Sequence, residues 1–363
     1  MANRAESYQP GSAMRMIPRF LDWVSRDISN TIYGSRLLGV GRTLMALAQL
    51  SVLLFTPSKY LFVPIGGSTL AERCSSEKVV RVSAYCISPE NHRMITYFMI
   101  AVLVVVASGI LPRYTSVLHF LVSFSIGTAI ALPDGGETVM QVMSFFIMIA
   151  CLADGRLWHW QDPKNGKWNR LNFLLGVSWA GSWFVRIQIA YIYIHSGLAK
   201  LAVEQWQDGT ATYYVSRMEY FGAAGFLDEV FRSVVAIPAI ALLSTWGTIV
   251  IEVTLGILIL VNSRRAGKVA IALCAFIHAW IAVSIGIISF AAIMLGAVIV
   301  ATSYSINKKT SLDGGTDEHA KDDVVSSTTA SGCIRHTGIR TPCPLRSIRV
   351  KPMRVGHPSI VRV

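Results

Sequence analysis

Six ionisable residues lie inside long apolar segments of the sequence. They are His119, Arg186, His195, Lys200, Glu252 and His278. Ionisable groups are costly in hydrocarbon, so such residues usually face a bundle interior or a wet cavity. A set with one acid, three histidines and a lysine can bind a charged group or move a proton. The sequence therefore predicts a polar interior with a chemical role.

One apolar segment carries most of these groups. Arg186, Tyr193 and Lys200 recur every seven residues and share one helix face, with Ser196 one turn below Lys200. His195 lies on an adjacent face, so it forms no preset dyad with Lys200. The small residues of "SGLAK" let another helix approach, and a partly desolvated Lys200 could act as a base. Arg186 is expected to extend its side chain to the lipid headgroups.

Glu252 stands far from both ends of its apolar segment and needs a partner. The candidates are Arg186, Lys200, His119 and His278. Ser244 and Thr248 share its helix face at spacings of four. The pattern allows two roles for Glu252: a catalytic acid, or one member of a buried ion pair that holds two helices in register. Taken singly, His119 and His278 are typical of hydrogen bonds between helices.

The elements that position these residues are membrane helices. The chain has 363 residues, of which 53% are hydrophobic and 15% charged, and its mean hydropathy is +0.49. Apolar runs of roughly 17 to 25 residues, the length that crosses a bilayer, recur along it. We predict an all-α bundle of eight spans, with a turn near 284–289; the last pair has the alternative of one helix and a re-entrant segment. The spans cover about 36–55, 94–111, 115–132, 138–153, 184–203, 236–261 and two within 269–303.

Lysine and arginine cluster at every second boundary between these spans, which predicts that both termini are cytoplasmic. The first 35 residues contain no apolar stretch typical of a signal peptide, so the first span is expected to direct its own insertion. The net charge of +12 is spread over separate loops. This distribution favours anchoring at the membrane surface and argues against a nucleic-acid partner.

Three regions follow from these patterns: a cytoplasmic N-terminal segment (1–35), a transmembrane domain (36–304) and a disordered basic tail (305–363). Cys74 and Cys86 share a loop that the orientation places outside, where a disulfide is expected and two free thiols are the alternative. The cysteines and histidines of the tail lack the spacing of a zinc module, so no metal site is predicted. Nucleotide-binding motifs are also absent from the sequence.

The stretch "RIQIAYIYIHSGLAKLAVEQWQDGTATYYV" (186–215) resembles the HTTM domain, a membrane domain shared with vitamin K-dependent gamma-carboxylase. Within that group the chain is most similar to the SdpB-like family of bacterial membrane proteins, which mature a secreted sporulation-delaying-type peptide toxin. A weaker likeness extends over Glu252 and "HAWIAVSIGIISF" (278–290). The family's lysine doublet is here Ala199 and Lys200, and the long exported domain of the carboxylase has no counterpart.

The resemblance implies maturation of an exported antimicrobial peptide. It assigns Lys200 as a base or positioning cation, helped by His195, with Glu252 and His278 completing a cavity. The residues expected to meet the substrate are Trp206, Asp208, Tyr213, Tyr214 and Arg186. Implied partners are a secreted peptide precursor, membrane lipids and a companion maturation protein; no cofactor is indicated. A quinone-linked enzyme similar to the carboxylase and a non-enzymatic export or immunity scaffold are the alternatives.

Overall fold

The computed structural model describes residues 12–130, 135–162, 172–218 and 226–307. The regular elements within these ranges are α-helices and two short 3-10 helices. Beyond residue 307, the tail expected to be disordered and basic lies outside the described residues.

The long helices of the bundle coincide with the eight apolar segments of the sequence. They are α2 (Arg36–Phe55), α5 (His92–Ser108), α6 (Pro112–Ala129), α7 (Gly136–Ala150), α8 (Asn172–Lys200), α12 (Pro238–Leu260), α13 (Arg264–Ile285) and α14 (Ile288–Ile306). Among the described residues, five of these are long and apolar enough to cross a membrane: α2, α8, α12, α13 and α14. The prediction of an all-helical membrane protein is confirmed, whereas eight spans stay a prediction.

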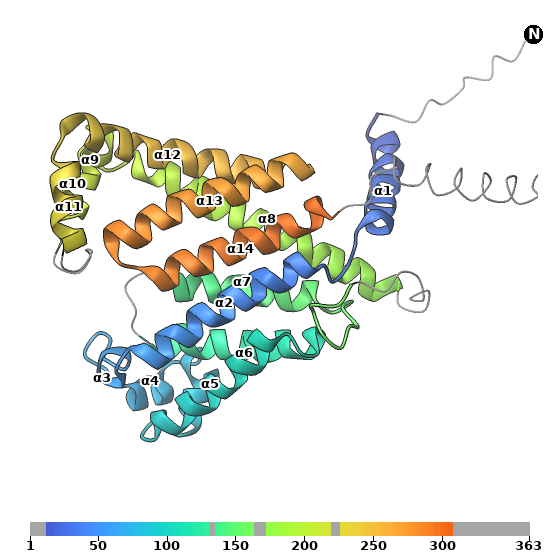
Figure 1. Ribbon diagram of the computed structural model, residues 1–363. Coiled ribbons are helices and arrows are strands. Elements are labelled where there is room, and N and C mark those ends of the chain that lie inside the picture. Colours follow the sequence, from blue (N-terminus) through green and yellow to red (C-terminus); the bar gives the residue numbers. More distant parts are fainter. Residues whose placement is uncertain (1–11, 131–134, 163–171, 219–225, 308–363) are drawn as a thin grey trace, which may run out of the picture. The chain divides into compact units, whose positions relative to one another are not determined.

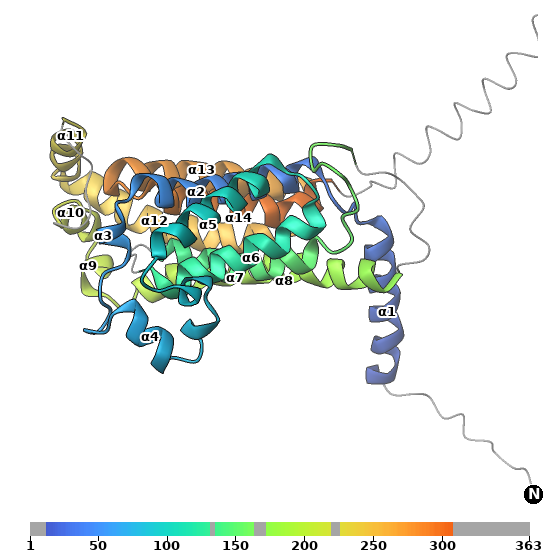
Figure 2. The ribbon, with the colours of Figure 1, turned by 90° about the horizontal axis from the view of Figure 1, so that it is seen from below.

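The shorter helices lie at the two ends of this bundle (Figure 1). At one end, called here the α11 end, are α3 (Ser58–Leu61), α4 (Leu70–Ser76), η1 (Val80–Val82), η2 (Ala84–Ile87), α9 (Glu204–Gln207), α10 (Ala211–Val215) and α11 (Phe226–Val235). At the other, the α1 end, α1 (Ser12–Asn30) runs across the direction of the long helices (Figure 2). The indoles of Trp179 and Trp183 in α8 hold α1 there by donating to the Asp27 carboxylate, at 2.9 and 3.3 Å.

α14 is the centre of the bundle, because most of its length is buried inside the protein. It crosses α2 where Gly41 faces Gly296. A Cβ added to Gly41 would lie 2.6 Å from the Gly296 carbonyl oxygen, so the two backbones approach too closely for any side chain. The core cluster that includes Met45, Ala297 and Ala301 packs around this crossing.

The apolar stretch 269–303 breaks into two helices, as its length predicts. α13 ends at Ile285 and α14 begins at Ile288. Gly286 between them has φ +82, the left-handed conformation that glycine adopts without strain. The turn predicted near 284–289 is therefore confirmed, and the two segments pack against each other as a helical hairpin.

Candidate functional site: an ion pair between two membrane helices

The last residue of α8, Lys200, forms an ion pair with Glu252 of α12. The Lys200 Nζ lies 2.9 Å from Glu252 Oε1 and 2.7 Å from Oε2. The ammonium also donates to Ser196 Oγ at 2.7 Å, one turn earlier on the same helix. Of the four partners considered for Glu252, the structure selects Lys200. This contact agrees with the positioning cation of the sequence analysis, and the role of Lys200 as a base stays a prediction.

Two glycines bring α8 and α12 close enough for this pair to form. Gly197 lies against Val253 and the Ile249 carbonyl, and Gly256 lies against Ile194 and the Ala190 carbonyl. A larger side chain at either position would separate the helices, because backbone atoms form part of each contact. The close approach predicted from "SGLAK" is confirmed.

The indole ring of Trp206 covers the ion pair from the α11 end. Lys200 Nζ lies 5.2 Å from the centre of that ring, within the range of a cation–π interaction. Trp206 belongs to the single-turn helix α9, which follows α8 after a short turn at residues 201–203. The side chains of Lys200 and Glu252 keep 19% and 10% of their exposure. The pair is therefore sheltered but not sealed.

A second polar group lies farther along the same face of α8. Tyr193 Oη is 2.8 Å from His278 Nε2 and 3.3 Å from Cys274 Sγ, both on α13. All three side chains are buried. The Glu252 carboxylate is near enough to Tyr193 to interact electrostatically. Tyr193 thus joins α8 to α13, a contact that the sequence did not predict, although its place on the Lys200 face was predicted.

The sequence expectation for Arg186 is wrong. Its side chain is 2% exposed instead of reaching the headgroups. The guanidinium donates to the Ile259 carbonyl at 2.9 Å and the Leu260 carbonyl at 3.3 Å, and its Nη1 donates to Asn262 Oδ1. These carbonyls end α12 and have no partner within the helix, so the buried cation satisfies them. Arg186 therefore lies in the middle of α8, about 21 Å along the helix axis from Lys200.

Four other expected site residues do not contact the ion pair. The His195 ring lies on the exposed face of α8 beside Tyr191, with ring centres 5.3 Å apart. Asp208 is exposed and accepts hydrogen bonds from Thr210. Tyr213 packs against Arg217, and Tyr214 is 54% exposed. Both tyrosines lie on α10, which is tied to α12 by a hydrogen bond between the Thr212 and Ser244 hydroxyls.

Two features at the α11 end bear on the predicted outer surface. Cys74 and Cys86 form a disulfide, as the loop position predicts. Glu137, one residue before the predicted 138–153 span, is buried at the start of α7, where Gln49 Nε2 donates to it at 2.6 Å.

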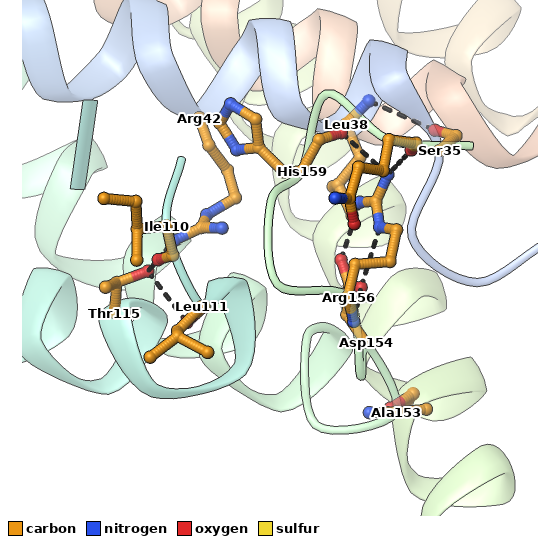
Figure 3. A network of polar contacts seen from close by, with 12 residues as sticks. Ser35, Leu38, Arg42, Ile110, Leu111, Thr115, Ala153, Asp154, Arg156 and His159 are labelled. Carbon is orange, nitrogen blue, oxygen red and sulfur yellow. Dashed lines mark hydrogen bonds and ion pairs between the residues drawn. The ribbon is translucent and has the colours of Figure 1, made fainter. Parts of the chain in front are cut away.

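The α1 end holds polar residues that sequence reasoning missed. Arg42 lies two turns into α2 and is buried, although a single arginine near the start of an apolar run resembles a headgroup anchor. The backbone of the 151–162 segment wraps this end, where Arg156 pairs with Asp154 at 2.7 Å (Figure 3). In the described ranges, no group of three histidine, cysteine or acidic residues has the arrangement of a metal site.

Fold and site together define a helical membrane protein with a charged pair buried between two of its apolar helices. The chain is 32% identical to "Sporulation-delaying protein SdpB" of Bacillus subtilis (strain 168), over 71% of this chain and 78% of that protein. It is also 32% identical to "Uncharacterized protein YitO" of the same strain, over 77% of this chain and 87% of that protein. The chain therefore belongs to the SdpB-like family.

No protein-family model matches the chain, so the resemblance to the HTTM domain stays a prediction. No solved structure matches it significantly either. The relationship to the two bacillus proteins is the basis for the functional conclusion.

Proposed function

We propose that this protein takes part in the maturation of an exported peptide toxin, and that the Lys200–Glu252 pair is where it meets the peptide. The relationship to a sporulation-delaying protein supports the part in toxin maturation. The observation that carries the site is a charged pair at the end of α8, sheltered by Trp206 yet partly accessible. Membrane lipids and a companion maturation protein are included in this proposal as partners.

The pair offers a donor and an acceptor side by side. The Lys200 ammonium can donate to a peptide carbonyl or carboxylate, and the Glu252 carboxylate can accept from a peptide N–H. Charge-assisted hydrogen bonds of this kind are stronger than neutral ones. Rotation of Trp206 on its short helix would expose both groups toward the α11 end. In this role Lys200 is a positioning cation, and the exposed His195 has no part.

A non-enzymatic scaffold is the second candidate, and one observation favours it. Both charges are already satisfied inside the chain, as they would be in a pair that only holds α8 and α12 in register. The two candidates differ in what they require of Lys200 and Glu252: peptide contact requires each charge at its own position, whereas register requires only that the charges be opposite.

The test measures mature peptide in the culture supernatant by mass spectrometry, together with the membrane level of the protein. We expect Lys200→Ala and Glu252→Gln to abolish mature peptide in the supernatant, while roughly half or more of the wild-type protein level remains in the membrane. His195→Ala is expected to keep peptide output. Asp228→Asn, which breaks the exposed Arg232–Asp228 pair on α11, is the matched control and should leave output unchanged.

The charge-swapped double variant, Lys200→Glu with Glu252→Lys, separates the candidates. Under the positioning role it restores the membrane level but not the peptide. Restoration of both would support the scaffold. Full peptide output in both single variants at normal protein level would refute the proposed site, and an unchanged supernatant after deletion of the whole gene would refute the proposed function.

A further inference from the structure

Arg42 is a buried cation whose charge the described chain leaves uncompensated. Its side chain is 1% exposed on α2. Nη2 donates to Thr115 Oγ1 of α6 at 3.2 Å, whereas Nε and Nη1 are buried and have no hydrogen-bond partner. No carboxylate of the described ranges lies within ion-pair distance of it. Figure 3 shows the side chain extending from α2 toward Thr115.

His119 adds a second unpartnered group beside this guanidinium. It follows Thr115 by one turn on α6 and is 1% exposed. Neither ring nitrogen has a hydrogen-bond partner. Arg42 is near enough to affect the ring electrostatically. The hydroxyl of the adjacent Ser116 donates to the Arg113 carbonyl of the same helix.

The surrounding groups add donors and no free acid. The Tyr304 hydroxyl of α14 and His159 Nδ1 of the 151–162 segment are also buried without partners. Cys151 and His159 both interact electrostatically with Arg42. The acid of this region, Asp154, is engaged by the Arg156 guanidinium through two hydrogen bonds of 2.9 and 2.7 Å. The cluster is therefore positive and rich in hydrogen-bond donors.

A guanidinium stays protonated in proteins and presents its donors in a planar fork that matches an oxyanion. Burying such a charge without a counter-charge is strongly unfavourable. Water could satisfy the hydrogen bonds but would supply no negative charge. We propose that α2 and α6 bind a small oxyanion here, a carboxylate or phosphate group, through Arg42, Thr115 and His119.

This site is separate from the Lys200–Glu252 pair. Arg42 lies two turns from the start of α2, at the α1 end, whereas Lys200 is the last residue of α8, at the α11 end. The oxyanion has two possible sources, a dissolved anion and the headgroup of an anionic lipid. Both offer the same chemistry to the guanidinium, and their binding can be measured separately.

The experiment uses the full chain, purified in a neutral detergent and freed of lipid. Its apparent Tm is compared in sodium phosphate and in sodium chloride at equal ionic strength. In a second arm the chain is placed in nanodiscs of phosphatidylcholine with or without phosphatidylglycerol. Because a ligand that binds only the folded state raises Tm, we expect a rise of roughly 2–4 °C in phosphate, in phosphatidylglycerol or in both. The arm that responds identifies the source.

Variants decide whether the response belongs to this site. Arg42→Gln should abolish the rise and His119→Gln should reduce it, while Arg265→Gln, at an exposed arginine of α13, should keep it. If Arg42→Gln fails to fold, the His119→Gln comparison with wild type decides. The proposal would be overturned if the Tm of the wild type changed neither between chloride and phosphate nor on addition of phosphatidylglycerol to the nanodiscs. A rise in Tm that persists in Arg42→Gln would also overturn it. Where Arg42→Gln does not fold, an undiminished rise in His119→Gln would do the same.

Discussion

Buried cations in this protein differ in what compensates them. Lys200 has a carboxylate, Arg156 has the Asp154 carboxylate, and Arg186 has the last carbonyls of α12. Arg42 has one hydroxyl. Because each arginine is fully charged, the surroundings determine its role: Arg186 caps a helix, Arg156 fixes a loop, and Arg42 is left to bind something else.

His159 offers a prediction at this scale that can be measured by pH. Its ring fits between Gly39 and Gly109, and burial, together with the charges of Arg42 and Arg156, lowers its pKa to about 4. The unfolded chain binds a proton near pH 6.5, whereas the folded chain does not. His159 therefore makes the folded state progressively less stable as pH falls from about 6.5 toward 4.

We expect apparent Tm to fall less steeply with decreasing pH over that range in His159→Gln than in the wild type. The difference should correspond to the uptake of up to about one proton on unfolding. The matched control is Thr43→Val, which removes a neighbour of the His159 ring but no titrating group. Thr43→Val should lower Tm by a similar amount at every pH. Parallel curves for wild type and His159→Gln would contradict the assignment.

At the scale of elements, glycines determine which helices touch. α2 and α14 meet through Gly41 and Gly296, and α8 and α12 meet through Gly197 and Gly256. In lipid, such small residues take the place of a hydrophobic driving force, because close backbone contact gives the best packing. The Lys200–Glu252 pair depends on the second crossing, and the central position of α14 depends on the first.

Gly41→Val is expected to destabilise the protein by more than about 1–3 kcal/mol, the usual cost of overpacking, because the new side chain meets a backbone carbonyl that cannot move aside. The measurement is apparent Tm in detergent together with the membrane level. Gly247→Val on α12 is the control, since no atom lies within 4 Å of its added Cβ. Equal losses in the two variants would show that helix propensity and not the crossing is responsible.

At the scale of the whole molecule, the two ends of the bundle differ in composition. The α11 end carries the Cys74–Cys86 disulfide and the acidic residues Asp228 and Glu229 of α11. The α1 end carries Arg36, Arg156 and the α1 helix. Because positive loops tend to stay in the cytoplasm and disulfides form outside it, we predict that the α11 end is exported.

Single-cysteine labelling tests this orientation. In a chain whose six cysteines are replaced by serine, Ser233→Cys on α11 should react with a membrane-impermeant maleimide in intact cells. Ser29→Cys on α1 should react only after the membrane is opened. Both positions are exposed on the protein, so a difference reports the side of the membrane. The reverse pattern would place Lys200 at the cytoplasmic face and would exclude a peptide approaching from outside.

The sequence alone determined the apolar helices and the turn at Gly286, because these depend on local composition and on the length of each run. It also singled out Lys200 and Glu252, because charges within apolar segments are conspicuous; their place in a functional site stays a prediction. It suggested the disulfide, since both cysteines fall in one loop.

Only the tertiary structure decided the partners. Spacing places Arg186 and Lys200 on one face of α8, but Arg186 caps the last carbonyls of α12 whereas Lys200 pairs with Glu252, about two turns earlier on that helix. The burial of Glu137 and Arg42 was missed for the same reason. Glu137 of α7 contacts α2, and Arg42 of α2 contacts α6, in both cases across helices that are distant in sequence. Hydropathy is a property of one segment, whereas compensation of a buried charge is a property of two or more segments, and so it becomes visible only when they are brought together.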